Sequence, residues 1–302
     1  MGKLGASPPI LTSHFNMRFR TLSACRLLLL ASVYVGCGTG SADTNDIIDA
    51  MEASFEDNLD GVETFTIYAA GMEVHHRLNT TDSLIFFDLG VTLADSSRPL
   101  PESARLIPYL VPDVPKLVRG LRTGARYVGT ETLNGQPVYV IEADNPSSLI
   151  VGTDAPSGGI SNARIYVDVE THALRGVTME MPPPDTTLTE MIVQHVRYEQ
   201  FRDVDGIALP FKVRSTTEGL RQLISDQLRI VEGGNLTIAR AQAQRLPHGE
   251  REVELARIAA RERFINEGIQ EDILTVDSVH VNSEIPSGVF AESDAVTIGP
   301  EG

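Results

Sequence analysis

The sequence predicts a mainly β protein of the α+β class, built on a curved antiparallel sheet with one apolar face. The clearest signal is residues 191–214, MIVQHVRYEQFRDVDGIALPFKVR. In both halves, large apolar side chains recur at even spacing, which is typical of strands with one buried face. They are Ile192, Val196 and Tyr198, then Ile207, Leu209, Phe211 and Val213. The Asp and Gly residues of the intervening Asp203-Val204-Asp205-Gly206 favour tight turns, so an antiparallel hairpin is predicted.

Pro210 interrupts the second of these strands. A proline has no N–H to donate to a β-ladder, and in sheets it is found at edges or at breaks in pairing. We therefore expect a sheet edge or a local break at this position.

Other stretches have the same alternating character. Strands are predicted at residues 62–70, 72–78 and 83–89, in hairpins at 126–143 and 163–181, and at 273–281. Asn134-Gly135 marks the turn of the first of these two hairpins. Every second side chain of a strand lies on the same face, and we call this rule strand parity. It assigns further side chains to an apolar face, namely Phe65, Ile67, Met72, Val74, Val177 and Met179.

Helices are predicted in three regions. Residues 44–57 carry apolar side chains at helical spacing. Prolines break residues 99–126 into short pieces, of which 115–121 is the best helix. This segment could cover the concave side of the sheet or form a surface loop. Residues 217–263 are rich in helix formers, with predicted pieces at 220–230, 236–245 and 250–266 and with Gly268 as the stop.

Residues 1–36 have the layout of an export signal, and the true start is predicted at Met17. The apolar run 27–35 is too short to cross a bilayer as a helix, which takes roughly 20 residues. Gly36 stands directly before Cys37, which resembles the lipobox of bacterial lipoproteins. Cys37 is therefore predicted to be acylated and to become the new N-terminus. The alternative is an ordinary signal peptide with a leftover cysteine.

The segments after the signal follow from this assignment. Residues 37–43 are predicted to be a lipidated tether, residues 44–292 one domain, and residues 293–302 a loose tail. The sequence has two cysteines, and the other one, Cys25, lies in the signal. A single sulfur remains after processing, so no intrachain disulfide is expected.

The charge balance excludes some partners. The net charge is -16, and residues 1–36 carry four basic and no acidic side chains, so the remaining chain stands at -20 (-16 less four). Nucleic acids and anionic membranes are polyanions, so this body will not bind either one by charge. We predict no nucleic-acid partner.

The sequence carries none of the common catalytic patterns: no G-x-S-x-G, H-E-x-x-H or C-x-x-C, and no phosphate-binding glycine loop. His75 and His76 are neighbours on a predicted strand and should point to opposite faces. Asp203 and Asp205 resemble the start of a calcium loop, but turn chemistry fits them better. The sequence leaves one alternative open, a nucleophile such as Ser161 that lies close in the fold to a histidine distant in the sequence. We predict a non-enzymatic protein with no metal and no cofactor.

An apolar cavity is the alternative to catalysis. A sheet with one apolar face and helical cover segments could enclose a site for acyl chains, and methionines adapt to irregular apolar ligands. Met72, Met179 and Met181 suit such a site. A solid packed core would give the same composition.

Several stretches, in this order, resemble the LolA/LolB-like family of outer-membrane lipoprotein-sorting proteins. They are VETFTIYAAG, YVGTETLNGQPVYVIEA, IYVDVETHALRGV, YEQFRDVDGIALPFKVR and VDSVHVNSEIPSGVF. The resemblance implies a half-open antiparallel β-barrel whose concave apolar face is covered by helices and holds lipid. Residues from about 217 to 272 would be a helical insertion.

The resemblance also implies a function. We predict a lipid-anchored periplasmic protein, with the outer membrane favoured over the inner, that binds acyl chains of lipids or lipoproteins and takes part in their sorting. The predicted cavity lining is Phe65, Ile67, Met72, Val74, Val177, Met179, Ile207, Leu209, Phe211 and Val213. The expected partners are these acyl chains, a membrane reached through Cys37 and a membrane transport protein, with the chain as a monomer. The alternative is a sensor or adaptor that acts through the helices at 217–272.

Overall fold

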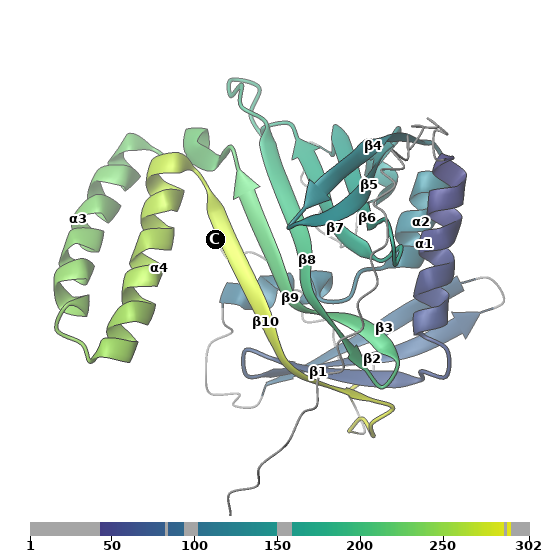
Figure 1. Ribbon diagram of the computed structural model, residues 1–302. Helices are drawn as coiled ribbons and strands as arrows, with labels where there is room; N and C mark the ends of the chain where they lie inside the picture. Colours follow the sequence, from purple (N-terminus) through teal and green to yellow (C-terminus); the bar gives the residue numbers. More distant parts are fainter. Residues whose placement is uncertain (1–42, 82–83, 94–101, 150–158, 287–288, 291–302) are drawn as a thin grey trace, which may run out of the picture. The chain divides into compact units, whose positions relative to one another are not determined.

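Ten antiparallel strands form one open sheet in the part of the chain that the structure describes (Figure 1). The structure is a computed structural model, and it describes residues 43–81, 84–93, 102–149, 159–286 and 289–290. The strand order is β3-β2-β1-β10-β9-β8-β7-β6-β5-β4. The strands are β1 (Thr64–Ala69), β2 (Met72–Thr81), β3 (Leu84–Leu93), β4 (Ala125–Leu133), β5 (Gln136–Ala143), β6 (Asn162–Asp168), β7 (Leu174–Met181), β8 (Ile192–Val204), β9 (Ile207–Glu218) and β10 (Gln270–Val281). The predicted signal, lipidation site and tail lie outside the described residues.

Strand β10 divides its pairing between two neighbours. Its first half pairs with β9, from Gln270 opposite Thr217 to Thr275 opposite Lys212. Its second half pairs with β1, from Val276 onward. The sheet therefore turns along β10, and its apolar face becomes concave.

Pro210 lies just beyond the point where β10 leaves β9. The β9–β10 pairing ends at Lys212, while Pro210 still lies opposite Phe201 of β8. The predicted local break is therefore correct, although β9 is a central strand. The proline sits where the missing N–H costs no ladder bond to β10.

The predicted β8–β9 hairpin is also confirmed. Val204 lies opposite Ile207, which leaves Asp205 and Gly206 as a two-residue turn, with φ of 53° and 90°. The Gly206 N–H donates to a carboxylate oxygen of Asp203 at 3.1 Å. Positive φ at both positions is typical of the turn that matches strand twist. The two aspartates thus serve the turn, and the described residues contain no cluster of three or more potential metal ligands.

Three helical segments cover the concave face: α1 (Thr44–Asn58), the 3-10 helix η1 (Glu102–Tyr109) and α2 (Val114–Arg122). Their buried side chains join those of the sheet in one hydrophobic cluster. They are Ile47, Ile48 and Met51 of α1, Leu106 and Ile107 of η1, and Val114, Leu117, Val118 and Leu121 of α2. The proline-broken segment is therefore a cover for the sheet and not a surface loop.

Two interactions hold this cover in place. Arg122, the last residue of α2, contacts Asp49 and Glu52 of α1 at 2.8 and 2.6 Å. At the start of α1, the Thr44 hydroxyl accepts a hydrogen bond from the N–H of Tyr127 at 2.9 Å. The cover is thus joined within itself and to the start of β4.

A helical hairpin lies between β9 and β10. It consists of α3 (Asp226–Ala243) and α4 (His248–Glu267), preceded by the short 3-10 helix η3 (Leu220–Leu223); a further 3-10 turn, η2 (Pro146–Leu149), follows β5. The predicted break between 230 and 236 is wrong, because α3 continues through Gly233-Gly234. Each glycine costs about 1 kcal/mol relative to alanine, and packing of Ala243 and its neighbours beside α4 outweighs that cost.

Gly268 ends α4, as predicted. It has φ of 70°, and a Cβ there would come within 2.0 Å of the Arg221 nitrogen. Its carbonyl accepts a hydrogen bond from the Leu220 N–H at 3.1 Å. This close approach closes the base of the helical hairpin.

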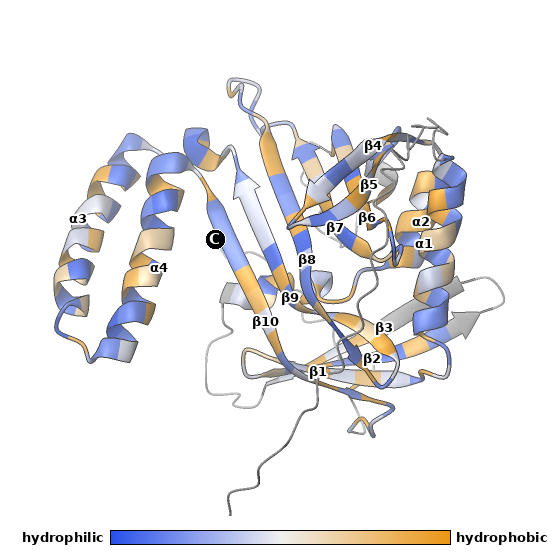
Figure 2. Cartoon of the chain, viewed as in Figure 1, coloured by the Kyte–Doolittle hydropathy of each residue, from blue (hydrophilic) through white to orange (hydrophobic). Residues whose placement is uncertain are grey.

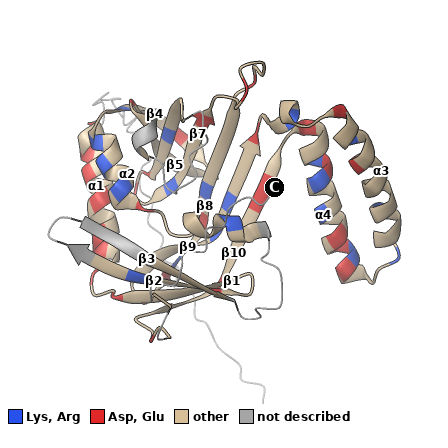
Figure 3. Ribbon diagram, turned by 180° about the vertical axis from the view of Figure 1, so that it is seen from behind, with Lys and Arg blue, Asp and Glu red and all other residues tan. Residues whose placement is uncertain are grey.

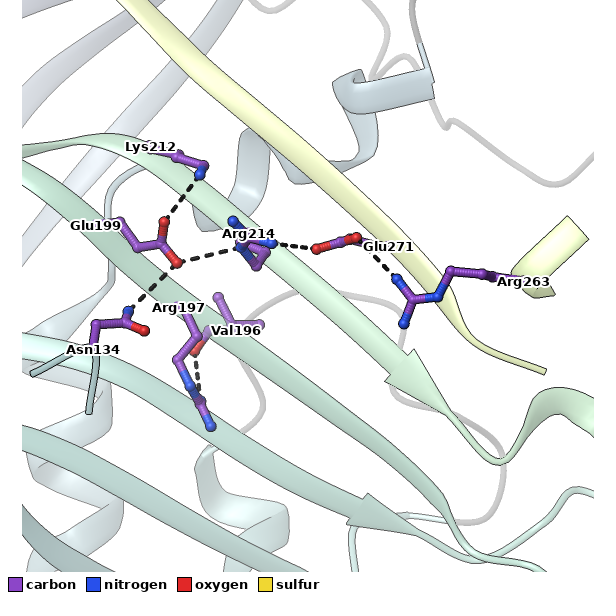
Figure 4. Close-up of polar contacts among 8 residues, drawn as sticks. All are labelled: Asn134, Val196, Arg197, Glu199, Lys212, Arg214, Arg263 and Glu271. Atoms are coloured by element: carbon purple, nitrogen blue, oxygen red, sulfur yellow. Dashed lines mark hydrogen bonds and ion pairs between the residues drawn. The ribbon is translucent and has the colours of Figure 1, made fainter. Parts of the chain in front are cut away.

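Charged side chains link the hairpin to the outer face of the sheet (Figure 4). Lys212 contacts Glu199 at 3.2 Å, and Glu199 contacts Arg214 at 3.3 Å. Arg214 in turn pairs with Glu271, and Glu271 contacts Arg263 of α4 at 3.4 Å. Isolated surface pairs contribute little to stability, but this chain of pairs crosses three strands and a helix.

His75 and His76 point to opposite faces, as predicted. His75 lies between the hydroxyls of Thr66 and Thr92, at 3.0 and 3.1 Å. His76 is 3% exposed and stacks on Phe65, with ring centroids 4.5 Å apart. Burial lowers the pKa of His76 from 6.5 to about 4.

His76 should make the fold sensitive to acid. The folded state holds it neutral, so its contribution is complete above pH 6.5 and is lost as the pH falls from 6.5 toward 4. The full loss corresponds to about 3 kcal/mol in the free energy of unfolding. His76→Phe keeps a ring against Phe65 and should flatten this part of the curve in urea titrations at pH 7 and pH 4. An equal acid-side loss in both proteins would contradict the assignment.

Candidate functional site

The ten residues assigned to the apolar face by strand parity do gather in one place. Eight are buried in the main hydrophobic cluster: Phe65, Ile67, Met72, Val74, Ile207, Leu209, Phe211 and Val213. Val177 and Met179 are partly buried and pack against it. The space between the concave face and the helical cover is therefore the candidate site.

A first cavity of about 50 Å³ lies between α1, the segment before α2, and strands β1 and β9. Three of the ten residues, Phe65, Ile207 and Leu209, line it. Met51 and Phe55 of α1 and Pro112 line it from the side of the cover. None of its lining side chains is Asp, Glu, Lys or Arg. An uncharged wall of this kind accepts hydrocarbon and excludes ions.

A second cavity, of about 40 Å³, lies between α2 and strands β7 and β8. Val177 and Met179 line it, together with Tyr198. Leu174 and Pro112 border both cavities and separate them. The other five residues of the predicted lining are packed in the core and border neither cavity: Ile67, Met72, Val74, Phe211 and Val213.

The second cavity also has polar groups. Burial raises the pKa of the Tyr198 hydroxyl, with a further contribution from Tyr109, so Tyr198 stays protonated and able to donate. Asp113 lies on the same wall, and its carboxylate caps α2 by accepting the Lys116 N–H at 3.0 Å. A few polar groups in an otherwise apolar site are what orients a ligand.

Both cavities are small. A volume of about 10–15 Å³ suffices for one water, so each cavity has room for a few small molecules at most. A long acyl chain fits only if the cover moves away from the sheet. The structure thus represents the closed form of any such site.

The sequence did not identify the cover residues that complete the lining. Pro112 and Tyr109 of the cover were missed because strand parity does not say which part of a face meets a helix. Leu174 begins β7, and alternation from Val177 misses it because the β6–β7 register shifts between Tyr166 and Val167. Tyr198 was predicted to share a face with Val196, and both line the second cavity. The proline cluster before residue 115 was the available signal for the cover.

The catalytic alternative gains no support from the described contacts. The Ser161 hydroxyl donates to the backbone carbonyl of Glu180 at 3.0 Å. His195 contacts the Thr178 hydroxyl at 3.0 Å, on the neighbouring strand. The Ser161 hydroxyl is thus bonded to backbone, and the described contact of His195 is with Thr178 and not with Ser161.

Helices in the described part of the chain are either too short or too polar to cross a membrane.

No family model and no curated protein matches this sequence. Three solved structures show a distant likeness. A domain from Vibrio parahaemolyticus, provisionally assigned to outer membrane lipoprotein sorting, aligns with 82% of this chain and 95% of its own at 12% identity and a TM-score of 0.39. A DUF1329 family protein from Desulfovibrio piger aligns with 82% and 97% at 10% identity and a TM-score of 0.39.

The third structure is the lipoprotein LppX of Mycobacterium tuberculosis, which aligns with 46% of this chain and 90% of its own at 14% identity and a TM-score of 0.22. The predicted similarity to lipoprotein-sorting proteins is thus present in the structure as a distant likeness. Values this low do not transfer a function, which must be inferred from the residues of this chain.

Truncation of the residue between the cavities should cost less than truncation elsewhere in the core. Leu174 already borders empty volume on two sides, so it has fewer packing contacts to lose. We expect Leu174→Ala to lower the free energy of unfolding by about 2–3 kcal/mol, and Leu274→Ala, 1% exposed and away from both cavities, by about 3–5 kcal/mol. Urea denaturation of both variants measures the difference, and the reverse order would refute the placement of Leu174.

Proposed function

We propose that this protein is a non-enzymatic, lipid-anchored periplasmic protein that binds acyl chains between its concave sheet face and its helical cover. On this proposal it takes part in sorting lipids or lipoproteins to the outer membrane. The observation that carries the proposal is the uncharged lining of the first cavity, directly beside a second apolar cavity.

Leu174 and Pro112 form the boundary that a ligand would have to displace. The two cavities share these residues, so a small outward shift of the segment around Pro112 would join them into one channel. Met51 and Met179 line the two cavities, and their flexible side chains adapt to a chain of changing shape.

The polar groups of the second cavity would then fix the head of the ligand. The protonated Tyr198 hydroxyl can donate to an ester or carboxyl oxygen, while the apolar first cavity takes the hydrocarbon. This orientation places the polar end near Asp113 at the start of α2.

The membrane anchor belongs to the same proposal. Acylation of Cys37 would hold the domain at a membrane, since each buried methylene contributes about 0.8 kcal/mol. Residues 37–43 would serve as the tether into α1.

Filling or enlarging the site should change acyl binding in opposite directions. Val177→Phe fills part of the second cavity and should weaken uptake of a fluorescent fatty acid about tenfold or more. Leu174→Ala joins the cavities and should strengthen uptake or favour longer chains. The matched controls are Val128→Phe, on the exposed part of β4, and Leu274→Ala. Uptake that is absent from delipidated wild-type protein, or equal in all variants, would refute the proposal.

The anchor has its own test. Cells grown with labelled palmitate should transfer the label to the wild-type chain and not to Cys37→Ala. A Cys37→Ala protein that still carries the label would show that acylation occurs elsewhere.

A further inference from the structure

The most exposed apolar side chains of the described residues lie together on the helical hairpin. Among the large hydrophobic residues whose burial the structure describes, four are more than half exposed: Ile230 (77%), Val253 (71%), Ile238 (60%) and Val231 (54%). Three of the four are on α3 and the other is on α4. A concentration of this kind marks a surface that contacts something.

The exposed residues of α3 form a continuous face. Val231 and Ile238 are seven positions apart, so they lie nearly in line along the helix. Ile230 and Gly234 lie eight and four residues before Ile238, so these exposed residues are on the same side. Figure 2 shows the hydrophobic residues recurring along α3. We call this surface, Ile230, Val231, Gly234 and Ile238, the open face of α3.

A different side of α3 faces α4. Leu236 and Ala239 border a groove shared with Ile258 of α4, and Ala243 is buried. The packing that holds the hairpin together therefore does not use the open face. The helix is apolar on two sides, and only one of them is covered within the described structure.

The acidic residues of α3 lie at the edge of the open face or away from it. Asp226, in the first turn beside Ile230, pairs with Arg229, and Glu232 pairs with Arg261 of α4 at 3.3 Å. The stretch of the open face from Val231 to Ile238 thus carries no acidic side chain.

The hairpin is also electrically unlike the rest of the protein. Residues 226–267 contain seven arginines and seven acidic residues, so their net charge is zero in a chain whose net charge is -16. Within the hairpin, α3 has four charged residues against nine in α4, and most of α3 is uncharged in the view from behind (Figure 3). An anionic surface would repel the acidic domain but not this hairpin.

We propose that the open face of α3 docks on a lipid bilayer, with its aliphatic side chains in the interfacial region. The helix has 18 residues and is about 27 Å long, and its open face lies opposite the side that packs on α4. Protein-binding surfaces are usually centred on aromatic anchors, and α3 contains no aromatic residue. The lipid surface therefore fits better than a protein partner.

The base of the hairpin gives this contact a fixed direction. Gly268 lies against Arg221, and Arg263 contacts Glu271 of β10. Docking by α3 would hold the domain at the bilayer in one orientation. This proposal is independent of acyl binding in the cavities, because the open face lines neither of them.

Tryptophan reporters test the docking directly, because the chain has no tryptophan of its own. The full chain with Cys37→Ala, which removes the proposed anchor, would carry either Ile238→Trp or Val128→Trp. With phosphatidylcholine vesicles, Ile238→Trp emission should shift to shorter wavelength and be quenched at least about twofold by lipids with brominated chains. Val128→Trp, on β4, should not respond. Equal responses, or none from Ile238→Trp, would overturn the proposal.

Vesicle flotation supplies a second measurement. In the Cys37→Ala chain, combined Ile230→Ser, Val231→Ser and Ile238→Ser substitutions should weaken vesicle binding about 100-fold, with little dependence on salt. Serine at Leu89, Val91 and Val128, which are exposed on β3 and β4, is the matched control and should leave binding intact. Fatty-acid uptake should be unchanged in both proteins, which separates this proposal from the cavity.

Self-association would be the competing explanation. If gel filtration without vesicles gave a dimer for the Cys37→Ala chain and a monomer for the α3 triple variant, the open face would bind a second copy. That result would overturn the lipid proposal.

Discussion

The divided pairing of β10 is the constraint on which the architecture depends. One strand bonds to β9 over its first half and to β1 over its second half, so the three strands at one end and the six at the other cannot lie in one plane. Their apolar faces turn toward each other, and other apolar side chains must occupy the space between them. The segments α1, η1 and α2 supply it, with side chains that complete the core. Pro210 fits this bend because its nitrogen is not needed where β10 departs.

The core that results is closed but not fully solid. Most of the apolar face packs tightly, as Ile67 and Val213 do, while the part beneath Pro112 leaves two small cavities. Packed interiors rarely hold empty volume without some cost in stability, because the lining atoms lose contacts. The incomplete packing lies beside a segment rich in proline. Movement of this segment would therefore break fewer packing contacts than movement of the rest of the cover.

Local chemistry determined much of this from the sequence, and long-range placement determined the rest. The Asp205-Gly206 turn follows from residues within four positions of each other, as does the end of α4 at Gly268. Strand parity placed Ile207 and Val213 on the same face correctly, but it cannot show that only Ile207 borders a cavity. That difference depends on where α1 and Pro112 pack against the sheet, and both are about 100 or more residues away from Ile207 in the sequence. The continuity of α3 through Gly233-Gly234 was mispredicted for the same reason, since packing with α4 outweighed glycine's local cost.

The contacts of Arg122 have a mechanical consequence. Asp43, the cap of α1, follows Cys37 by only six residues in the sequence, and α1 is joined to α2 through Asp49 and Glu52. If Cys37 is the proposed anchor, tension on the tether would enter the domain at the start of α1, where Thr44 also bonds to Tyr127 of β4. Movement of the domain away from this proposed anchor would pull on α1, and the contacts of Arg122 would pass part of that force to α2, which borders the second cavity.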